Sequence, residues 1–270
     1  MKVLIYVNKD KDLDNSWENN LTSLLDLYNI EYQSITSRDL DSTFFGDAIF
    51  VLGGDGTILD LTEFSSRNNV PIIGINAGKL GFLTEFERFE TEQAVKMLVN
   101  NELKLDERLT LNIEVDDRSY IALNEVTIQR LFSENGGRVI GLNVDIDGNS
   151  VDKVIGDGII VCTPTGSTGY SLSAGGAILA PGINAFSVTP ISAHSLSNRP
   201  VIFSAESNCK VCHNLGDNAV VLVDGKFICY LQRGKSVCVN KSDKIVKFLR
   251  RRDFNFFTLL SKKMVGKKEV

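Results

Sequence analysis

The sequence lacks the common short motifs of nucleotide-binding and hydrolytic enzymes. Its 270 residues contain no Walker P-loop, no Rossmann G-x-G-x-x-G and no nucleophile elbow around a serine. It has only two histidines, and no Ser–His–Asp spacing supports acyl transfer. No apolar run approaches the roughly 20 residues that span a bilayer, so we expect no membrane partner.

The sequence is also poor in positive charge and in pairable cysteines. A net charge of −5 argues against nucleic-acid binding, and five cysteines, an odd number, argue against a secreted disulfide framework. Cys209-x-x-Cys212, followed by His213, has the spacing of a zinc or redox pair, but no second pair exists and a buried strand is favoured. The apolar run at residues 3–7 is too short for a signal peptide, so we expect a first strand and a cytoplasmic protein.

Strand-like and helix-like segments alternate over the first hundred residues. This order predicts a parallel, doubly wound sheet that binds ligands at the carboxyl ends of its strands. We expect an α/β domain over residues 1–100. The predicted strands are residues 3–7, 31–35, 48–52 and 72–76, and the predicted helices are residues 13–28, 57–67 and 91–99.

From about residue 101 the apolar residues alternate with a period of two. Short turns separate the runs, which predicts a second, mainly antiparallel β-rich domain over residues 101–252. A last segment, residues 253–265, has one apolar helical face, and we expect this C-terminal helix to return to the first domain. The predicted strands are residues 109–115, 120–129, 139–147, 158–162, 219–223, 227–231 and 236–239.

The most informative motif is Gly-Gly-Asp-Gly-Thr at residues 53–57, between a predicted strand and a predicted helix. Glycines let the backbone approach a phosphate closely. A carboxylate beside phosphate makes sense if Asp55 accepts a proton from a hydroxyl or holds a metal. The motif therefore indicates phosphoryl transfer to an alcohol. The alternative is a plain turn in which Asp55 caps the helix.

The second domain has three further candidate sites. Residues 163–176 combine glycines, hydroxyls and Tyr170, a composition that favours ligand binding over a plain surface loop. Asn124 and Glu125 lie in a strand-like run that disfavours both residues, and they suit ribose hydroxyls or a metal. Asp157 stands between two glycines, a pattern equally typical of a hairpin turn. His194 is favoured as a structural histidine.

Together these segments closely resemble the bacterial NAD kinases that use ATP or polyphosphate. The resemblance covers residues 2–264 and implies an α/β N-terminal domain and a β-rich C-terminal domain. It also implies transfer of the ATP γ-phosphoryl group to the 2′-hydroxyl of the adenosine ribose of NAD, with Mg²⁺ as cofactor and a homo-oligomer, either dimer or tetramer. The matching segments are residues 53–57, 75–83, 124–125, 163–176 and 194–200.

The resemblance also implies roles for single residues. Asp55 matches the acid that accepts the proton of the 2′-hydroxyl, and no residue is assigned to the metal. Lys226 stands where a glutamine often contacts the ligand, which puts that contact in doubt. The positions that match ligand contacts are Asp55, Gly56, Asn124, Glu125, Arg138, Asp157, Thr168, Gly169, Tyr170, Ser171, Leu172, Ser173 and Lys226.

Two other classes of function stay open at this point. Lipid kinases and 6-phosphofructokinases share a Gly-Gly-Asp-Gly type of turn, although the lipid kinases do not need the hydroxyl-rich segment at residues 163–176. A non-catalytic NAD(H) sensor gains nothing from an acid beside phosphates, so Asp55 argues against it.

Overall fold

The computed structural model of the chain describes residues 1–76, 78, 81–131, 138–195 and 197–264. It divides into two compact units: unit 1 is Met1–Glu107 with Val246–Val270, and unit 2 is Arg108–Ile245. Two long strands, β6 (Leu103–Val115) and β17 (Ser236–Arg251), pass from one unit into the other. The division therefore falls inside continuous strands, after Glu107, whereas the sequence predicted a boundary after residue 100.

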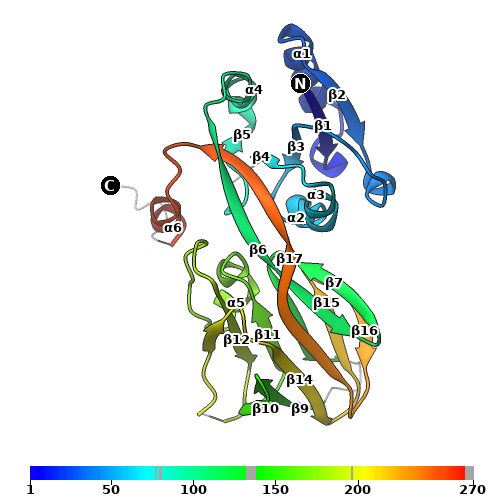
Figure 1. Cartoon of the computed structure of the whole chain (residues 1–270), viewed down its shortest axis with the longest axis vertical. Coiled ribbons are helices and arrows are strands. Elements are labelled where there is room, and N and C mark those ends of the chain that lie inside the picture. Colours follow the sequence, from blue (N-terminus) through cyan, green and yellow to red (C-terminus); the bar gives the residue numbers. More distant parts are fainter. Residues whose placement is uncertain (77, 79–80, 132–137, 196, 265–270) are drawn as a thin grey trace. The chain divides into compact units, whose positions relative to one another are not determined.

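Unit 1 contains a parallel sheet of four strands in the order β4-β3-β1-β2 (Figure 1). The strand order reverses beside β1, because β2 and β3 flank it on opposite sides. In such sheets ligands bind at the carboxyl ends of the strands where the order reverses. The strands are β1 (Lys2–Val7), β2 (Glu31–Ile35), β3 (Ala48–Gly53) and β4 (Ile72–Asn76), and the short β5 (Phe86–Glu87) pairs with β4.

Helices follow the strands of unit 1 as the sequence predicted. α1 (Ser16–Leu27) and α4 (Thr91–Val99) share a buried apolar cluster with β1, β3 and β4. The predicted helix at residues 13–28 begins only at Ser16, because the buried Asp12 carboxylate accepts the backbone N–H groups of Trp17 and Glu18. Short 3₁₀ turns are η1 (Lys9–Lys11), η2 (Ser37–Asp39) and η3 (Arg88–Glu90).

Two other helical predictions for unit 1 have different outcomes. The single helix predicted over residues 57–67 is wrong, because α2 (Asp55–Leu59) and α3 (Thr62–Asn68) are separate. The C-terminal helix is present as α6 (Phe256–Met264), and the Phe256 ring contacts Phe82 of the same unit, with centroids 6.4 Å apart. No helix among the described residues is long and apolar enough to cross a membrane.

Unit 2 is built from antiparallel strands around one apolar core, which confirms the predicted β-rich fold. A six-stranded sheet of this unit has the order β13-β12-β11-β8-β15-β16. These strands are β8 (Glu125–Arg130), β11 (Gly158–Cys162), β12 (Ala185–Ile191), β13 (Val201–Ser204), β15 (Ala219–Val223) and β16 (Lys226–Leu231). Further strands are β7 (Arg118–Ala122), β9 (Ile140–Ile146), β10 (Asn149–Gly156) and β14 (Cys209–Leu215), and short helical turns are η4 (Gly166–Thr168) and α5 (Tyr170–Ser173).

Two irregularities of unit 2 fall on predicted site residues. The strand predicted over residues 120–129 is broken, because β7 ends at Ala122 and β8 begins at Glu125. Asp157 is not in a hairpin turn, since β10 pairs with β9 whereas β11 pairs with β8 and β12. Asn124 and Asp157 therefore lie at breaks between strands, and binding residues are common at such positions.

Candidate active site

The Gly-Gly-Asp-Gly turn lies at the carboxyl end of β3, next to the strand reversal at β1. β3 is buried along its whole length, and Asp55 is the first residue of α2. A Cβ on Gly53 would lie 2.4 Å from Thr57 Oγ1, so only glycine fits there. Asn8 Nδ2, beyond the end of β1, donates to Thr57 Oγ1 at 3.1 Å and links the two strand ends. A Cβ on Gly56 would meet no atom within 4 Å.

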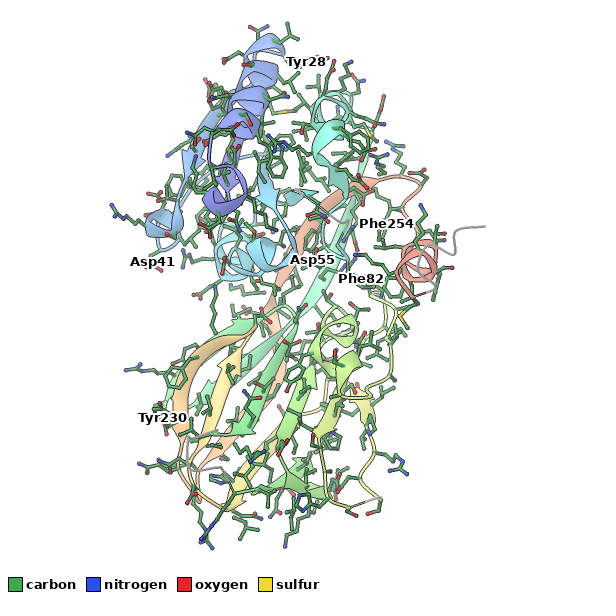
Figure 2. The ribbon with its side chains drawn as sticks, turned by 180° about the vertical axis from the view of Figure 1, so that it is seen from behind. Tyr28, Asp41, Asp55, Phe82, Tyr230 and Phe254 are labelled. Carbon is green, nitrogen blue, oxygen red and sulfur yellow. The ribbon has the colours of Figure 1, made fainter. Side chains whose placement is uncertain are left out.

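The Asp55 carboxylate is oriented by a loop that follows β4, here called the amide loop (residues 81–84). Oδ2 accepts the backbone N–H of Phe82 at 2.7 Å, and Oδ1 accepts those of Leu83 at 3.1 Å and Thr84 at 3.4 Å. Figure 2 shows Asp55 and Phe82 close together. The interpretation of Asp55 as the cap of its own helix is wrong: the N-cap is Gly54, whose N–H contacts Thr57 instead. A carboxylate has about four acceptor sites, so Oδ2 keeps one for a ligand.

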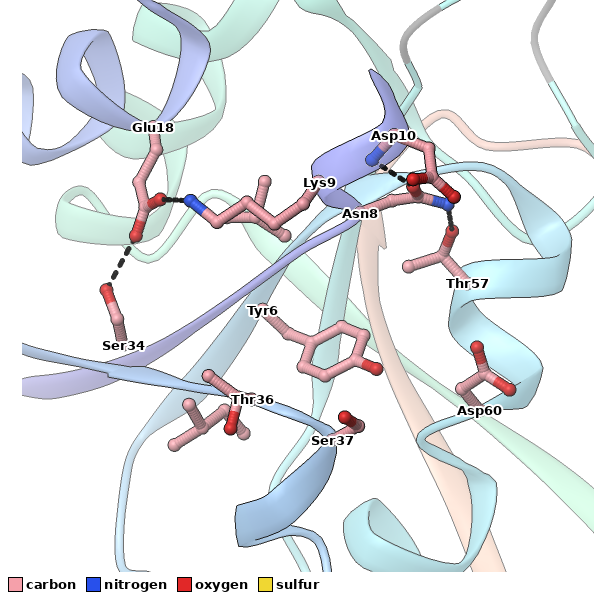
Figure 3. A pocket seen from close by; sticks show the side chains of 12 residues that line it. Tyr6, Asn8, Lys9, Asp10, Glu18, Ser34, Thr36, Ser37, Thr57 and Asp60 are labelled. Atoms are coloured by element: carbon pink, nitrogen blue, oxygen red, sulfur yellow. Dashed lines mark hydrogen bonds and ion pairs between the residues drawn. The ribbon is translucent and has the colours of Figure 1, made fainter. Parts of the chain in front are cut away.

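A cavity of about 370 Å³ opens at the carboxyl ends of β1 and β2 (Figure 3). The Tyr6 ring and the oxygen atoms of its neighbours form much of the wall. Burial raises the pKa of Tyr6, and the negative charge of Asp60 raises it further. Residues that line the cavity include Tyr6, Asn8, Thr36, Ser37, Thr57 and Asp60. The cavity shares Asn8 and Thr57 with the Asp55 turn, so the two features are continuous.

In unit 2 an aspartate that the sequence analysis did not select organises the break between β7 and β8. Asp224 and Gly225 form the two-residue turn between β15 and β16, with φ of 46° and 78°, as a type I′ turn requires. The Asp224 carboxylate accepts the N–H groups of Leu123 at 2.8 Å, Asn124 at 2.8 Å and Glu125 at 3.1 Å. The Asp-Gly pair indicated a turn, but nothing local indicated these distant partners.

Glu125 is a buried acid whose pKa lies well above the usual value for a glutamate. Burial, followed by the nearby charge of Asp224, raises the pKa of Glu125 to about 8. Its Oε2 has no hydrogen-bond partner among the described residues. A Cβ on Gly169 would lie 3.4 Å from Glu125 Oε2 and 3.7 Å from Asn124 Nδ2. The structure thus brings together three predicted ligand residues, and at neutral pH the Glu125 carboxyl can both donate and accept a hydrogen bond.

Several hydroxyl groups at residues 163–176 form hydrogen bonds within the protein. Thr163 Oγ1 donates to the Leu123 carbonyl at 2.5 Å, and Ser167 Oγ accepts the Leu179 N–H at 2.9 Å. Ser171, a predicted ligand contact, is fully buried and its hydroxyl lies 3.0 Å from Thr189 Oγ1. The predicted contacts in this segment that keep some exposure are Thr168, Gly169, Tyr170, Leu172 and Ser173.

The remaining predicted residues are scattered over unit 2. Asp157 Oδ1 lies 2.7 Å from Arg130 Nε in an ion pair. Arg138 is exposed and follows residues 132–137, which lie outside the described chain. Lys226 is exposed at the start of β16, and its charge opposes the rise in the pKa of Asp224 that burial causes. His194 is also exposed. Of the segments at residues 75–83 and 194–200, residues 77, 79, 80 and 196 are outside the described part.

The described residues contain no group of three or more His, Cys, Asp or Glu side chains placed to hold a metal ion. Cys209 and Cys212 lie on the alternating strand β14, with Cys209 buried, in line with the favoured structural interpretation. The donor set of this part of the chain does not form a dedicated metal site.

Comparison with known proteins decides the family. A model of the ATP-NAD kinase N-terminal domain matches residues 4–103, and a model of the C-terminal domain matches residues 123–251. The chain belongs to the NAD kinase family. An NAD kinase of Caldicellulosiruptor bescii is 34% identical over 264 residues, which cover 98% of this chain and 99% of that protein. The NAD kinase of Thermococcus kodakarensis is 39% identical over 207 residues, or 76% and 73% of the two chains.

Solved NAD kinase structures share the fold. A crystal structure of an NAD kinase from Archaeoglobus fulgidus in complex with ATP superposes with a TM-score of 0.80 at 26% identity and covers 98% of this chain and 100% of that one. The crystal structure of yeast NADH kinase complexed with NADH has a TM-score of 0.82 and 23% identity, and the match covers 100% of this chain and 89% of that one. At this identity the likeness shows the fold alone. The family predicted from the sequence motifs is confirmed.

The raised pKa of Glu125 predicts how the stability of unit 2 changes with pH. In the unfolded chain the carboxyl ionises near 4.5, and in the folded chain near 8. Between these values the unfolded state binds fewer protons, so raising the pH favours unfolding. We expect Glu125→Gln to be more stable than the wild type at pH 8, by about 2–5 kcal/mol, with little difference near pH 4.

Urea unfolding curves measured from pH 4 to pH 9 check this expectation. Glu114→Gln is the matched control, because Glu114 is an exposed acid of the same unit. The control should follow the wild type at every pH. A Glu125→Gln advantage that does not grow between pH 5 and pH 8 would contradict the raised pKa.

Proposed function

We propose that the protein transfers the γ-phosphoryl group of ATP to the 2′-hydroxyl of the adenosine ribose of NAD and so forms NADP. One observation carries the proposal. The Asp55 carboxylate lies where the strand order of the parallel sheet reverses, and backbone N–H groups of the amide loop orient it. One of its acceptor sites is left for a ligand. Membership of the NAD kinase family and the likeness to an NAD kinase that binds ATP support it.

Asp55 is the base in this proposal. A ribose hydroxyl is a poor nucleophile at neutral pH, and a positioned carboxylate that takes its proton contributes typically about 10²–10⁴-fold to the rate. The free acceptor site on Oδ2 receives that proton, while the N–H groups of Phe82 and Leu83 keep the carboxylate in one orientation. The open space beside Gly56 gives the donor phosphates room near the acid.

Each unit supplies its own binding groups. In unit 1 the cavity beside Tyr6 takes the ATP donor, since its polar wall is continuous with the Asp55 turn. In unit 2 the neutral Glu125 and Asn124 bind hydroxyl groups of NAD, because a ribose diol needs both a donor and an acceptor. Tyr170 offers an exposed aromatic face to the dinucleotide. We further propose a homo-oligomer.

A magnesium ion would neutralise negative charge on the ATP phosphates. Mg²⁺ is usually bound through substrate phosphates and water with one or two carboxylates, rather than by an all-protein cage. The described residues lack such a cage. The proposed mechanism therefore assigns no residue of the chain to the metal.

Replacement of the proposed base should lower turnover strongly without preventing folding. Asp55→Asn keeps the acceptor for the N–H of Leu83 but cannot take a proton, so we expect kcat to fall by about 10²–10⁴-fold with nearly unchanged NAD binding. A coupled assay of NADP formation, together with calorimetric titration of NAD, measures both quantities. Asp41→Asn, at an exposed aspartate of the same unit, is the control. Turnover near the wild-type value in Asp55→Asn would refute the base assignment.

Loss of the aromatic face should act on binding more than on chemistry. Tyr170 is 41% exposed at the start of α5, where its ring is available to a ligand. We expect Tyr170→Ala to raise the KM for NAD by about tenfold and to change kcat by less than about threefold. Tyr230→Ala, at a tyrosine of the same unit that is 54% exposed, is the control. If KM for NAD stays the same, Tyr170 is not part of the binding surface.

A further inference from the structure

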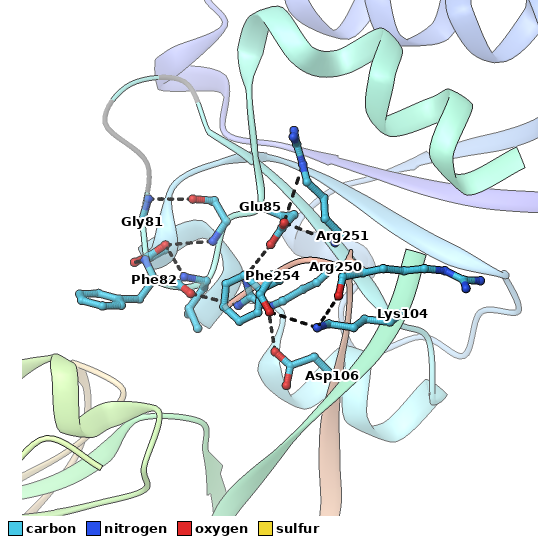
Figure 4. A network of polar contacts seen from close by, with 12 residues as sticks. Gly81, Phe82, Glu85, Lys104, Asp106, Arg250, Arg251 and Phe254 are labelled. Carbon is cyan, nitrogen blue, oxygen red and sulfur yellow. Dashed lines mark hydrogen bonds and ion pairs between the residues drawn. The ribbon is translucent and has the colours of Figure 1, made fainter. Parts of the chain in front are cut away.

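Arg250 is a fully buried cation at the end of β17, within unit 1 (Figure 4). Its Nε lies 2.8 Å from Asp106 Oδ2 and its Nη1 lies 3.1 Å from Glu85 Oε2. The guanidinium also lies over the Phe254 ring, 4.2 Å from the centroid. The two carboxylates compensate the charge, and the other N–H groups of the buried guanidinium need further acceptors.

A third polar contact of Arg250 reaches the amide loop. Arg250 Nη2 donates to the backbone carbonyl of Phe82 at 3.0 Å. The Phe82 carbonyl and the Leu83 N–H belong to one peptide group, which is planar and trans, so the two point in opposite directions. On its other side this peptide donates the Leu83 N–H to Asp55 Oδ1 at 3.1 Å. One rigid peptide group therefore connects the buried guanidinium with the Asp55 carboxylate.

Other contacts also hold the amide loop in place beside Asp55. A Cβ on Gly81 would lie 1.8 Å from Asp55 Oδ1, so the loop approaches the carboxylate as closely as glycine allows. The Gly81 N–H donates to Thr84 Oγ1 at 2.8 Å, and the Glu85 N–H donates to the Gly74 carbonyl at 2.9 Å. The loop is thus closed on itself and attached to β4, and Arg250 fixes the peptide in its middle.

We propose that Arg250 is a positioning residue: with Glu85 and Asp106 it fixes the Phe82–Leu83 peptide and thereby holds the Asp55 carboxylate in its reactive orientation. The inference rests on the proposed function of Asp55. Arg250 touches no reacting atom, and its effect on the reaction passes through the amide loop.

The first test compares two neighbouring arginines. Arg250→Lys keeps the charge but removes the planar guanidinium, which donates to Glu85, Asp106 and the Phe82 carbonyl at the same time. We expect kcat to fall by about tenfold or more, with KM for ATP and for NAD changed by less than about threefold. Arg251→Lys is the matched control, because Arg251 also pairs with Glu85 but its side chain binds Glu90 rather than the amide loop. A kcat for Arg250→Lys equal to that of Arg251→Lys would overturn the proposal.

The second test asks whether Arg250 acts through Asp55. If it does, adding Arg250→Lys to Asp55→Asn should cost no further turnover, because the orientation of a lost base no longer matters. The same fold loss in both backgrounds would show a merely structural role and would overturn the proposal. Full activity of Asp55→Asn alone would instead refute the proposed function, so the two failures are distinguishable.

A milder variant keeps the test decisive if thermal denaturation shows that Arg250→Lys does not fold. Asp106→Asn removes one charged partner of Arg250 and leaves the guanidinium in place. We expect a loss in kcat of about three- to tenfold, again with nearly constant KM values. An unchanged kcat in a folded Asp106→Asn protein would overturn the proposal.

Discussion

In each unit one aspartate carboxylate accepts three consecutive backbone N–H groups from a distant segment of the chain. In unit 1 Asp55 holds residues 82–84, and in unit 2 Asp224 holds residues 123–125. Hydrogen bonds to charged groups contribute about 1.5–3 kcal/mol each, so such a contact fixes both the carboxylate and the loop. Asp55, Asn124 and Glu125 take part in these two contacts, so their positions depend on this interaction.

The Asp55 and Asp224 contacts differ in which group they orient. The Asp55 carboxylate is itself the candidate reacting group, and the N–H groups orient it. Asp224 instead orients Asn124 and Glu125, and its charge joins burial in raising the pKa of Glu125. The same interaction therefore gives an oriented carboxylate in unit 1 and a neighbouring acid with a raised pKa in unit 2, because the surrounding groups differ.

Local patterns in the sequence were enough to predict the fold class and the Asp55 turn. The parallel sheet follows from alternating strand and helix periods, and the need for Gly53 follows from the tight turn. The patterns failed where long-range contacts decide. No local pattern shows that the Ser171 hydroxyl lies beside the hydroxyl of Thr189. Asp224 and Arg250 gave no signal, because their partners are about 100 and 168 residues away in sequence.

The path of β17 has a consequence for the order in which the protein matures during synthesis. The strand is 16 residues long and begins in unit 2, but its last residues, including Arg250, belong to unit 1. Every residue of unit 2 has therefore been synthesised before the segment that completes unit 1. The nascent chain carries Asp55 for most of its synthesis without the guanidinium partner of the Phe82 carbonyl, so the contacts around the Asp55 carboxylate are completed last.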